Sequence, residues 1–590
     1  MEPTPTREPT SSGAEPSVAS LQQENAALRE EIARVSVERD ELKKRAEFLK
    51  RELDRLLDLM KTPREHVDRQ QLQLAFAALS KELLELLPKM DPMVEAPAAN
   101  GGDNTDQPRR PKRRHTPHGR SLLPEHLPSE TLTLKPSPLP PNAEFVRNEV
   151  SVKLGYRPGS YYRLFVVRPI YAVNAADAPL CTEVSATLES APAGAPSTAA
   201  PPTSTVPATA CESVEVMPVD KLDRTLVCAP APDEMIARGL PTCEVLAHLM
   251  VGKFADKLPY HRQEGIIARA GVEITRGTMC EWTARCHDLA KYVVTAMTDD
   301  ALKTAHCIAV DATGVLVQAN DKCKNGHFWV LVSDQTHVLF RYSARHSSDE
   351  PKRFLNGFSG VVVADASNVY DQLYAQPDGP TEQGCFAHAR RYFYKALGSD
   401  KPRALVGIEF CNRLFEVERS IAKLPPDKKR HARETLSAPI LEAFRRWRIE
   451  QLASSAVAEQ TPIRRALQYL ENHWDALTYF VRDGRVPIHN NRSELELRRL
   501  VIGRANWLFV GSDESAEWTC TLVSLVASCQ LHGLDPEAYL RDLFRVLPTW
   551  PKTRMLELAP AHWTVTRSRL DESELRRPLG PLAIPVRLET

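Results

Sequence analysis

The sequence lacks the features that mark secreted, membrane-spanning and strongly charged proteins. Twelve cysteines are scattered through 590 residues without a CxxC pair, and the closest two are Cys280 and Cys286. This pattern predicts reduced thiols in a cytoplasmic protein. No run approaches the ~18 apolar residues of a membrane span, and residues 1–16 have no apolar core like that of a signal peptide. Because the formal net charge is zero, binding to nucleic acid would have to come from local patches.

The length predicts about four domains rather than one core. Composition and periodicity predict a multidomain α+β protein. The N-terminal part is expected to contain a disordered tail at 1–17, a coiled coil at 18–61, a helical segment at 62–100 and a basic linker at 101–144. A small β region at 145–230, with a Pro/Ala-rich insert at 185–210, and a helix-turn-helix-like region at 231–297 follow. The rest is expected to form an α/β core at 298–400, a helical stretch at 401–488, a second part of the core at 489–548 and a C-terminal tail at 549–590.

A heptad repeat runs from Leu21 to Met60. Apolar residues recur every seven positions, and a second, mostly apolar position follows four residues after each. The 3.5-residue period predicts a coiled coil and at least a dimer, although a single amphipathic helix packed on a domain is the alternative. Asn25 at an a position favours a parallel dimer. The expected dimerisation residues are Leu21, Asn25, Leu28, Ile32, Val35, Leu42, Leu49, Leu53 and Leu56.

A basic arm, "RRPKRRHTPHGR", lies in the linker and carries six positive and no negative charges. Such a run is typical of a solvated, disordered segment, and also of an arm that lies on DNA phosphates or in a minor groove. The candidate DNA-binding residues of this arm are Arg109, Arg110, Lys112, Arg113 and Arg114.

Three helices are predicted between about residues 241 and 297. The second is closed by Gly271, and the turn "GVEI" separates it from a third that starts near Thr275. These proportions are those of a helix-turn-helix, in which Arg276, Thr278 and Glu281 would face a DNA groove. A plain helical bundle fits the same pattern.

Two apolar runs, "HCIAVDATG" and "GVVVADASN", end in Asp311 and Asp365. Continuous apolar runs suit strands buried on both faces of a sheet, and sites form at the carboxyl ends of such strands. Between the two runs the sequence predicts two antiparallel strands and a helix. A single strand-end aspartate is more often a turn former, but two that frame this order can share divalent metal ions.

Four stretches together resemble the insertion sequence 66 family of transposases, which have an RNase H-like core. They are "GLPTCEVLAHLMVGKFADKLPYHRQEGIIARAGVEITRGTM", the strands around Asp311 and Asp365, "GCFAHARRYFYKAL", and "NNRSELELRRLVIGRANWLFVGSD" with the following "SCQLHGLDPEAYLRDLF". The resemblance runs from about Leu122 to Pro548. It implies an RNase H-like α/β core in which residues 401–488 form a helical insertion.

This resemblance implies a catalytic acid triad of the DDE type at Asp311, Asp365 and Glu494. Three carboxylates would hold two Mg²⁺ or Mn²⁺ ions, which suit the cleavage and joining of phosphodiesters. The implied partners are double-stranded DNA, both transposon ends and target, and small accessory proteins of the same element. Arg498 and Arg504 are further DNA-binding candidates on the helix of Glu494.

Cys385 and His388 match a cysteine-x-x-histidine feature of several transposase families and are interpreted as structural support near the core. The sequence departs from the family at the small zinc-binding domain, whose two cysteine pairs are missing, so no structural zinc is expected. His489, Ala312 and Ala505 stand where aspartate, glutamate and lysine are common. The rival interpretations are a decayed transposase that acts only as a dimeric DNA-binding protein, and an RNase H-like nuclease without transfer activity.

The helix that carries Glu494 also carries Glu496, and the two point in nearly opposite directions because a helix turns about 100° per residue. Glu494 shares a face with Leu497, which can pack on the sheet. Glu496 shares the other face with Arg499 and is expected on a solvated surface with ordinary ion pairs. A capping box with Asn491 as N-cap and Glu494 at the third position is the alternative role for Glu494.

Overall fold

The computed structural model describes residues 123–178, 183–191, 224–320 and 322–587, and the structural statements below concern these residues. The predicted tail at 1–17, coiled coil at 18–61, helical segment at 62–100 and basic arm lie outside them, so these remain predictions. Within the described ranges, no helix has the length and apolar character needed to cross a membrane.

The first sheet contains strands β1 (Ser129–Ser137), β2 (Glu144–Arg157), β3 (Ser160–Asn174), β4 (Glu183–Ala191) and β5 (Arg224–Cys228). Its order is β2-β3-β1-β4, and β5 pairs with β3 beyond the end of β1. All pairs are antiparallel except β1 with β3. One face packs around a small apolar core that contains Leu132, Leu164 and Val166.

Two parts of this sheet correct the sequence-based layout. Strand β1 lies inside the predicted linker at 101–144, and β4 overlaps the predicted Pro/Ala-rich insert at 185–210. These strands pair with each other along their whole length, from Ser129 opposite Ala191 to Ser137 opposite Glu183. Because the two strands are about fifty residues apart in the sequence, no local pattern predicts that they pair. The predicted strands between 146 and 173 are confirmed as β2 and β3.

The three predicted helices are present as α3 (Cys243–Phe254), α4 (Tyr260–Ala268) and α5 (Arg276–Thr304). The Thr275 side chain caps α5 by accepting a hydrogen bond from the Thr278 amide. The turn between α4 and α5 contains Gly271 at φ +79°, where a side chain would be strained and its Cβ would meet His126 at 2.8 Å. Helix α5 continues beyond the predicted end at 297 because its apolar stripe extends to Ala301.

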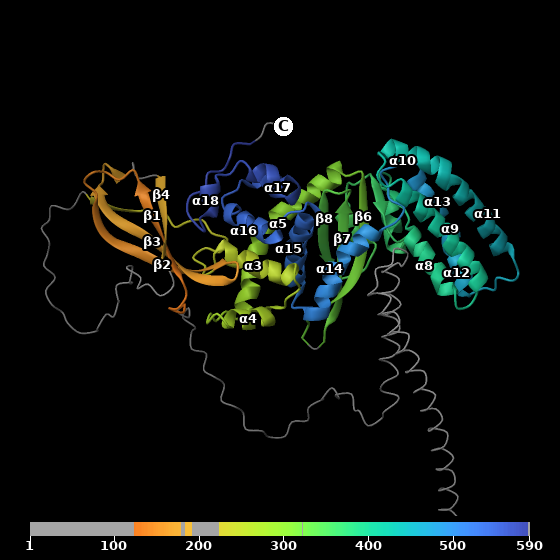
Figure 1. Cartoon of the computed structure of the whole chain (residues 1–590), viewed down its shortest axis with the longest axis horizontal. Helices are drawn as coiled ribbons and strands as arrows, with labels where there is room; N and C mark the ends of the chain where they lie inside the picture. The colour runs from red at the N-terminus through yellow and green to blue at the C-terminus, as the bar shows by residue number, and fades with distance from the viewer. Residues whose placement is uncertain (1–122, 179–182, 192–223, 321, 588–590) are drawn as a thin grey trace, which may run out of the picture. The chain divides into compact units, whose positions relative to one another are not determined.

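The second sheet carries the central part of the fold (Figure 1). It contains β6 (Cys307–Val317), β7 (Lys324–Ser333), β8 (His337–Ser343), β9 (Val361–Val363) and β10 (Thr381–Gln383), in the order β10-β9-β6-β7-β8. Helix α6 (Asp349–Phe354) connects β8 to β9, which confirms the predicted order of strand, strand, strand, helix, strand. The β6, β9 and β10 strands are parallel, whereas β6, β7 and β8 are antiparallel. This mixed sheet with flanking helices is compatible with an RNase H-like core.

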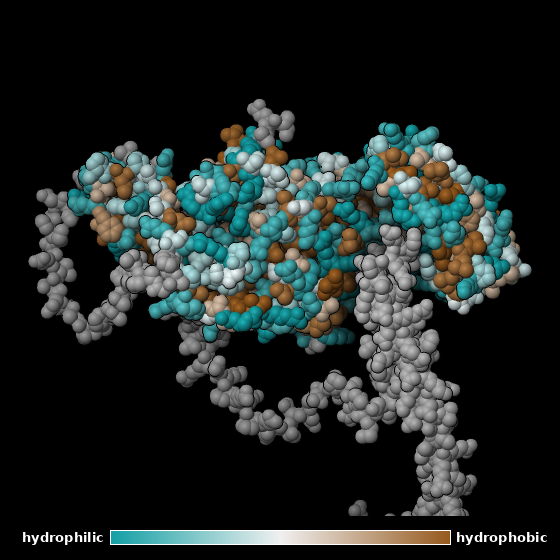
Figure 2. All heavy atoms as spheres, in the orientation of Figure 1, coloured by the Kyte–Doolittle hydropathy of each residue, from teal (hydrophilic) through white to brown (hydrophobic). Residues whose placement is uncertain are grey.

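Apart from β10, the chain between β9 and the last part of the core is mostly helical. A short 3-10 turn (Asn368–Tyr370) and α7 (Asp371–Tyr374) precede β10. After it come α8 (Phe386–Ala396), α9 (Lys401–Ser420), α10 (Pro426–Ala432), a π-helical turn (Arg433–Ser437), α11 (Ala438–Ala453), α12 (Pro462–Asn472), α13 (Trp474–Thr478) and a 3-10 turn (Tyr479–Val481). Phe393, Phe410, Phe444 and Trp447 form the aromatic centre of this unit. The space-filling view shows apolar patches over it (Figure 2), and Leu405, Leu436 and Ile449 are among its exposed apolar residues.

The remaining helices return to the two sheets. They are α14 (Asn491–Trp507), α15 (Asp513–Leu531), α16 (Pro536–Val546), a 3-10 segment (Lys552–Leu558), α17 (Pro560–Arg567) and α18 (Glu572–Arg576), with the short strand β11 (Phe509–Val510) after α14. Strand β8 is at the edge of its sheet, and the Ser528 and Ser524 hydroxyls on α15 accept hydrogen bonds from the Val338 and Phe340 amides at 3.0 and 2.7 Å. A buried helix thus satisfies the open edge of the strand.

The predicted C-terminal tail at 549–590 folds into helical segments up to Arg576 and contributes buried residues to the core as far as Leu579, which corrects the sequence-based interpretation. Trp563, Leu570 and Leu575 are buried, and Leu579 joins the core of the first sheet. These apolar residues are widely spaced along the chain. Only the packing of the segment against distant elements gives it a hydrophobic face.

Candidate active site

Asp311 and Asp365 are held side by side by two parallel strands. The last residues that pair between β6 and β9 are Ala309 and Val363. Asp311 lies two positions after Ala309, and Asp365 lies two positions after Val363. Side chains two positions apart point to the same face of a strand. Asp311 was expected at the end of its strand, but β6 continues to Val317, so that expectation is wrong. The strand continues because β7 still pairs with it, whereas β9 has ended.

The pKa of Asp311 is raised to about 7. Burial is the largest cause, the Ala312 amide donates a hydrogen bond at 2.8 Å that opposes it, and the carboxylates of Asp365 and Glu494 raise the pKa further. The three predicted triad residues therefore lie within electrostatic range of one another. Arg391 partly offsets their negative charge.

Asp365 is fixed by the turn that follows β9. Its Oδ1 accepts a hydrogen bond from the Ser367 amide at 3.2 Å, and its carbonyl accepts one from the Tyr469 hydroxyl at 3.3 Å. Ala366, directly after it, has φ +55°. A non-glycine residue in this left-handed region stores local strain that the surrounding structure has to hold in place. Tyr469 comes from α12, so the helical unit helps to position this aspartate.

Glu494 lies in the first turn of α14. Its Oε1 is 3.6 Å from His388 Nε2 and 3.6 Å from Arg391 Nη2, both on α8. The N-cap of α14 is Asn490, so the alternative capping box with Asn491 as N-cap is wrong. Helix α14 packs on β6 and β7, which brings its first turn to the strand positions of the two aspartates.

Asn490 joins α14 to the strand of Asp311, a role that the sequence analysis missed. It is fully buried, and its Nδ2 donates to the Val310 carbonyl at 2.7 Å, one residue before Asp311. The Ser493 hydroxyl donates to Asn490 Oδ1 at 2.5 Å. The asparagine pair at the helix start was the available signal, because a buried asparagine needs partners for its amide.

Cys385 and His388 lie at the start of α8. The buried Cys385 Sγ accepts a hydrogen bond from the backbone amide of Asn490 at 3.2 Å, and this bond joins the starts of α8 and α14. His388 faces Glu494. Its pKa is lowered by burial and by Arg391, while Glu494 and Asp365 act in the opposite direction. Neutral imidazole is therefore favoured beside the carboxylates.

Glu496 is buried, which corrects the expectation of a solvated position. Its side chain is only 5% exposed, and it accepts a hydrogen bond from Arg499 Nε at 2.5 Å. Arg499 also contacts Gln530 on α15, so this face of α14 is covered by another helix. Beside it, the pKa of Lys257 is lowered to about 8 by burial and then by Arg499. The sequence could not show which helix would cover this face.

The described DNA-binding candidates have different surroundings. Arg276 is exposed at the start of α5, whereas the Thr278 hydroxyl lies 3.0 Å from that of the capping residue Thr275. Arg504 donates hydrogen bonds to the Thr313 hydroxyl at 3.1 Å and to the Gly314 carbonyl, so it connects α14 to β6. Arg498 lies four residues after Glu494 and is half-buried. Their roles in DNA binding remain predictions.

The donor set suits a hard divalent cation, since three carboxylates supply oxygen ligands. Burial and the two neighbouring acids disfavour the charged form of Asp311, and a bound cation would relieve that cost. In the described part of the chain, however, no three His, Cys, Asp or Glu side chains are already close enough to hold a metal ion. The carboxylates are thus neighbours without being a preassembled ligand cage.

Comparison with known families identifies the class of protein. Residues 238–518, which include all three acids, match the model described as "Transposase IS66 family", and residues 524–561 match the "IS66 C-terminal element". The chain belongs to the IS66 family of transposases.

Three relatives from Sinorhizobium fredii (strain NBRC 101917 / NGR234) carry the names uncharacterized protein y4hP, y4qI and y4jD. They are 27%, 29% and 28% identical over 364, 358 and 356 residues, each match spanning 57% of this chain. The matches span 64%, 65% and 68% of the relatives' own lengths. The chain thus covers less than two thirds of the first two.

Proposed function

We propose that this protein is a DNA transposase that binds the ends of its insertion sequence and catalyses metal-dependent strand cleavage and strand transfer. Asp311, Asp365 and Glu494 would be the catalytic carboxylates. The observation that carries the proposal is the convergence of three acids from adjacent parallel strands and from the first turn of α14, which lies against α8. The raised pKa of Asp311, caused first by burial and then by the two other acids, agrees with it. Membership of a transposase family gives this cluster its chemical context.

Each carboxylate would serve as a metal ligand from a braced position. Asp311 lies inside a paired strand, Asp365 directly precedes the strained residue Ala366, and Glu494 lies on a helix whose start is tied to β6 and α8 through Asn490. When bound, two Mg²⁺ or Mn²⁺ ions would stabilise negative charge on the attacking and leaving oxygens of the phosphodiester. At 3.6 Å the contacts of Glu494 with His388 and Arg391 are longer than hydrogen bonds, so its carboxylate would be available as a ligand.

Arg391 would balance the cluster before metal arrives. Its guanidinium lies beside Glu494 and also acts on Asp311 and His388. Three acids in a partly buried place repel one another, and a fixed cation reduces that cost. The side chain is 46% exposed, so a DNA phosphate could also reach it.

The proposed partners are double-stranded DNA, both transposon ends and target, a second copy of this chain through the predicted coiled coil, and small accessory proteins of the same element. The basic arm and the exposed Arg276 would contribute to end binding, since clustered cations neutralise phosphates. A decayed protein that only binds DNA differs from this proposal at one step, the cutting of the phosphodiester.

The test is cleavage of DNA that carries the terminal sequences flanking the gene, with the full chain and Mg²⁺. Asp365→Asn should abolish cutting and joining and leave end binding intact. Asp371→Asn is the matched control, because Asp371 is exposed on α7 only six residues further along. Near-native cutting by Asp365→Asn would refute the site. End binding without any cutting by the unaltered protein would leave only the DNA-binding role.

A further inference from the structure

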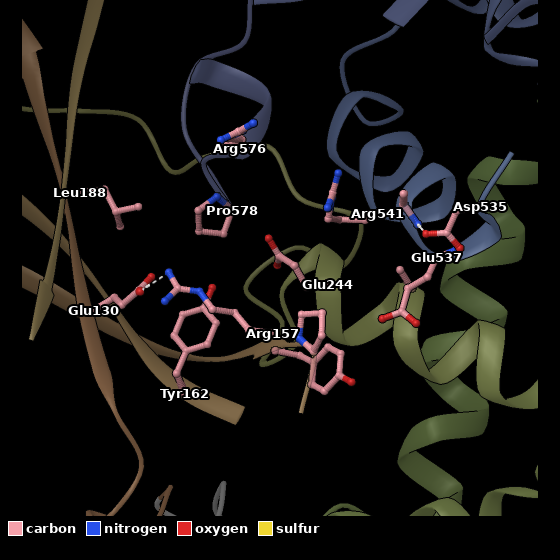
Figure 3. A pocket seen from close by; sticks show the side chains of 14 residues that line it. Glu130, Arg157, Tyr162, Leu188, Glu244, Asp535, Glu537, Arg541, Arg576 and Pro578 are labelled. Atoms are coloured by element: carbon pink, nitrogen blue, oxygen red, sulfur yellow. Dashed lines mark hydrogen bonds and ion pairs between the residues drawn. The ribbon is translucent and has the colours of Figure 1, made fainter. Parts of the chain in front are cut away.

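A cavity of about 390 Å³ lies where the first sheet meets α3, α16 and the segment after α18 (Figure 3). None of its lining residues belongs to the candidate active site. Acidic side chains enter it from three different elements: Glu130 from β1, Glu244 from α3 and Glu537 from α16. The rings of Tyr156 and Tyr162 also line it. The cavity is large enough for a ligand of amino-acid size.

Two of these acids have an oxygen that is buried without a hydrogen-bond partner among the described residues. Glu130 is 3% exposed; its Oε1 pairs with Arg157 and accepts from the Ser190 hydroxyl, whereas its Oε2 has no partner. The Oε2 of Glu244 is in the same condition. In Figure 3 the Glu244 side chain extends from α3 toward the middle of the lining residues. Leaving carboxylate oxygens dry and unpaired is costly for a folded protein.

The arginines that line the cavity already have acidic partners. Arg157 pairs with Glu130, Arg541 pairs with Asp542 at 2.6 Å, and Arg576 pairs with Glu572 at 3.1 Å. Because Arg157 and Arg541 also act on Glu130 and Glu244, the unmet need in this space is for N–H donors to the two Oε2 atoms rather than for an anion. Tyrosine rings beside the carboxylates add faces on which a flat or rounded cation can rest.

We infer that this cavity binds an organic cation with several N–H donors, a guanidinium or a primary ammonium group, between Glu130 and Glu244. The cation can come from a free small amine or from an arginine or lysine side chain of a peptide segment. The basic run at 109–120 of this chain is such a segment, and it lies shortly before β1 in the sequence. Both sources present the same chemistry to the two carboxylates.

The experiment is isothermal titration of the full chain with argininamide, and separately with a peptide of residues 107–121. Citrullinamide, which keeps the α-ammonium group but has a neutral urea in place of the guanidinium, is the ligand control for the guanidinium group. Glu130→Gln/Glu244→Gln should weaken binding about a hundredfold, because each of the two lost charged hydrogen bonds is worth about tenfold. Glu514→Gln/Glu517→Gln removes the same charge from exposed positions on α15 and should leave affinity unchanged.

Saturable binding of argininamide that depends on the two cavity acids supports a free cation as ligand, and binding of the peptide alone supports a side chain as ligand. Equal affinity of the cavity variant and the unaltered protein would overturn the inference, as would absence of saturable binding by both probes. A stability measurement separates a ligand-binding role from a structural one. Glu244→Gln should leave Tm unchanged or raise it, whereas a clear fall would show that the carboxylate serves the fold.

Discussion

Glu494 and Glu496 are two residues apart on one helix, and the structure gives them opposite expected phenotypes. Glu494 is 23% exposed and has only long contacts, at 3.6 Å, with His388 and Arg391. Such pairs contribute about 0–1 kcal/mol to stability. Glu494→Gln should therefore fold normally, with Tm within about 2 °C of the unaltered protein. If Glu494 is a metal ligand, the same change should reduce cleavage about a thousandfold or more, since several kcal/mol of transition-state stabilisation are lost.

Glu496→Gln should do the reverse. The residue is buried and pairs with Arg499 at 2.5 Å, and Lys257 lies close to that arginine. Removal of the charge leaves Arg499 without its carboxylate, although glutamine keeps the volume and one acceptor. The expected cost is about 1–3 kcal/mol, which lowers Tm by a few degrees. The folded fraction of the variant should still cut DNA at the native rate.

The assay is thermal unfolding of both variants beside single-turnover cleavage of end DNA in Mg²⁺. Glu494→Gln that cuts at near the native rate would end its assignment to the triad. Glu496→Gln that unfolds at the native temperature would refute the reasoning about the buried ion pair. Loss of stability in both variants would show that the helix, rather than the site, dominates the response.

Three further predictions concern other parts of the chain. In metal-free protein, the raised pKa of Asp311 makes the folded state bind a proton between about pH 4 and 7, so stability falls as pH rises through that range. Asp311→Asn should therefore raise Tm at pH 8 and change it little at about pH 4. A peptide of residues 18–61 should sediment as a dimer or larger at high micromolar concentration, and a monomer would contradict the heptad interpretation. Neutralising Arg109–Arg114 should weaken DNA binding across all sequences and flatten its salt dependence, whereas a change in sequence preference alone would contradict a phosphate-binding role.

The sequence by itself determined the elements that depend on local patterns. Continuous apolar runs predicted β6 and β9, and the positions of Gly271 and Thr275 predicted the end of α4 and the start of α5 to within a few residues. These features follow from periodicity and from residues with strong backbone preferences, which act within a few positions. The same apolar runs singled out Asp311 and Asp365, although Asp311 lies inside β6 rather than at its end.

Tertiary structure alone decided which faces are covered. Glu496 has the neighbours of a surface residue in the sequence, yet α15 covers it. Asn490 and Cys385 are more than a hundred residues apart and meet only because α8 and α14 start at the same place. The pairing of β1 with β4 and the burial of Trp563 also depend on partners far along the chain. Burial and long-range pairing are properties of the packed chain, because they depend on which distant surface arrives, and no local stretch carries that information.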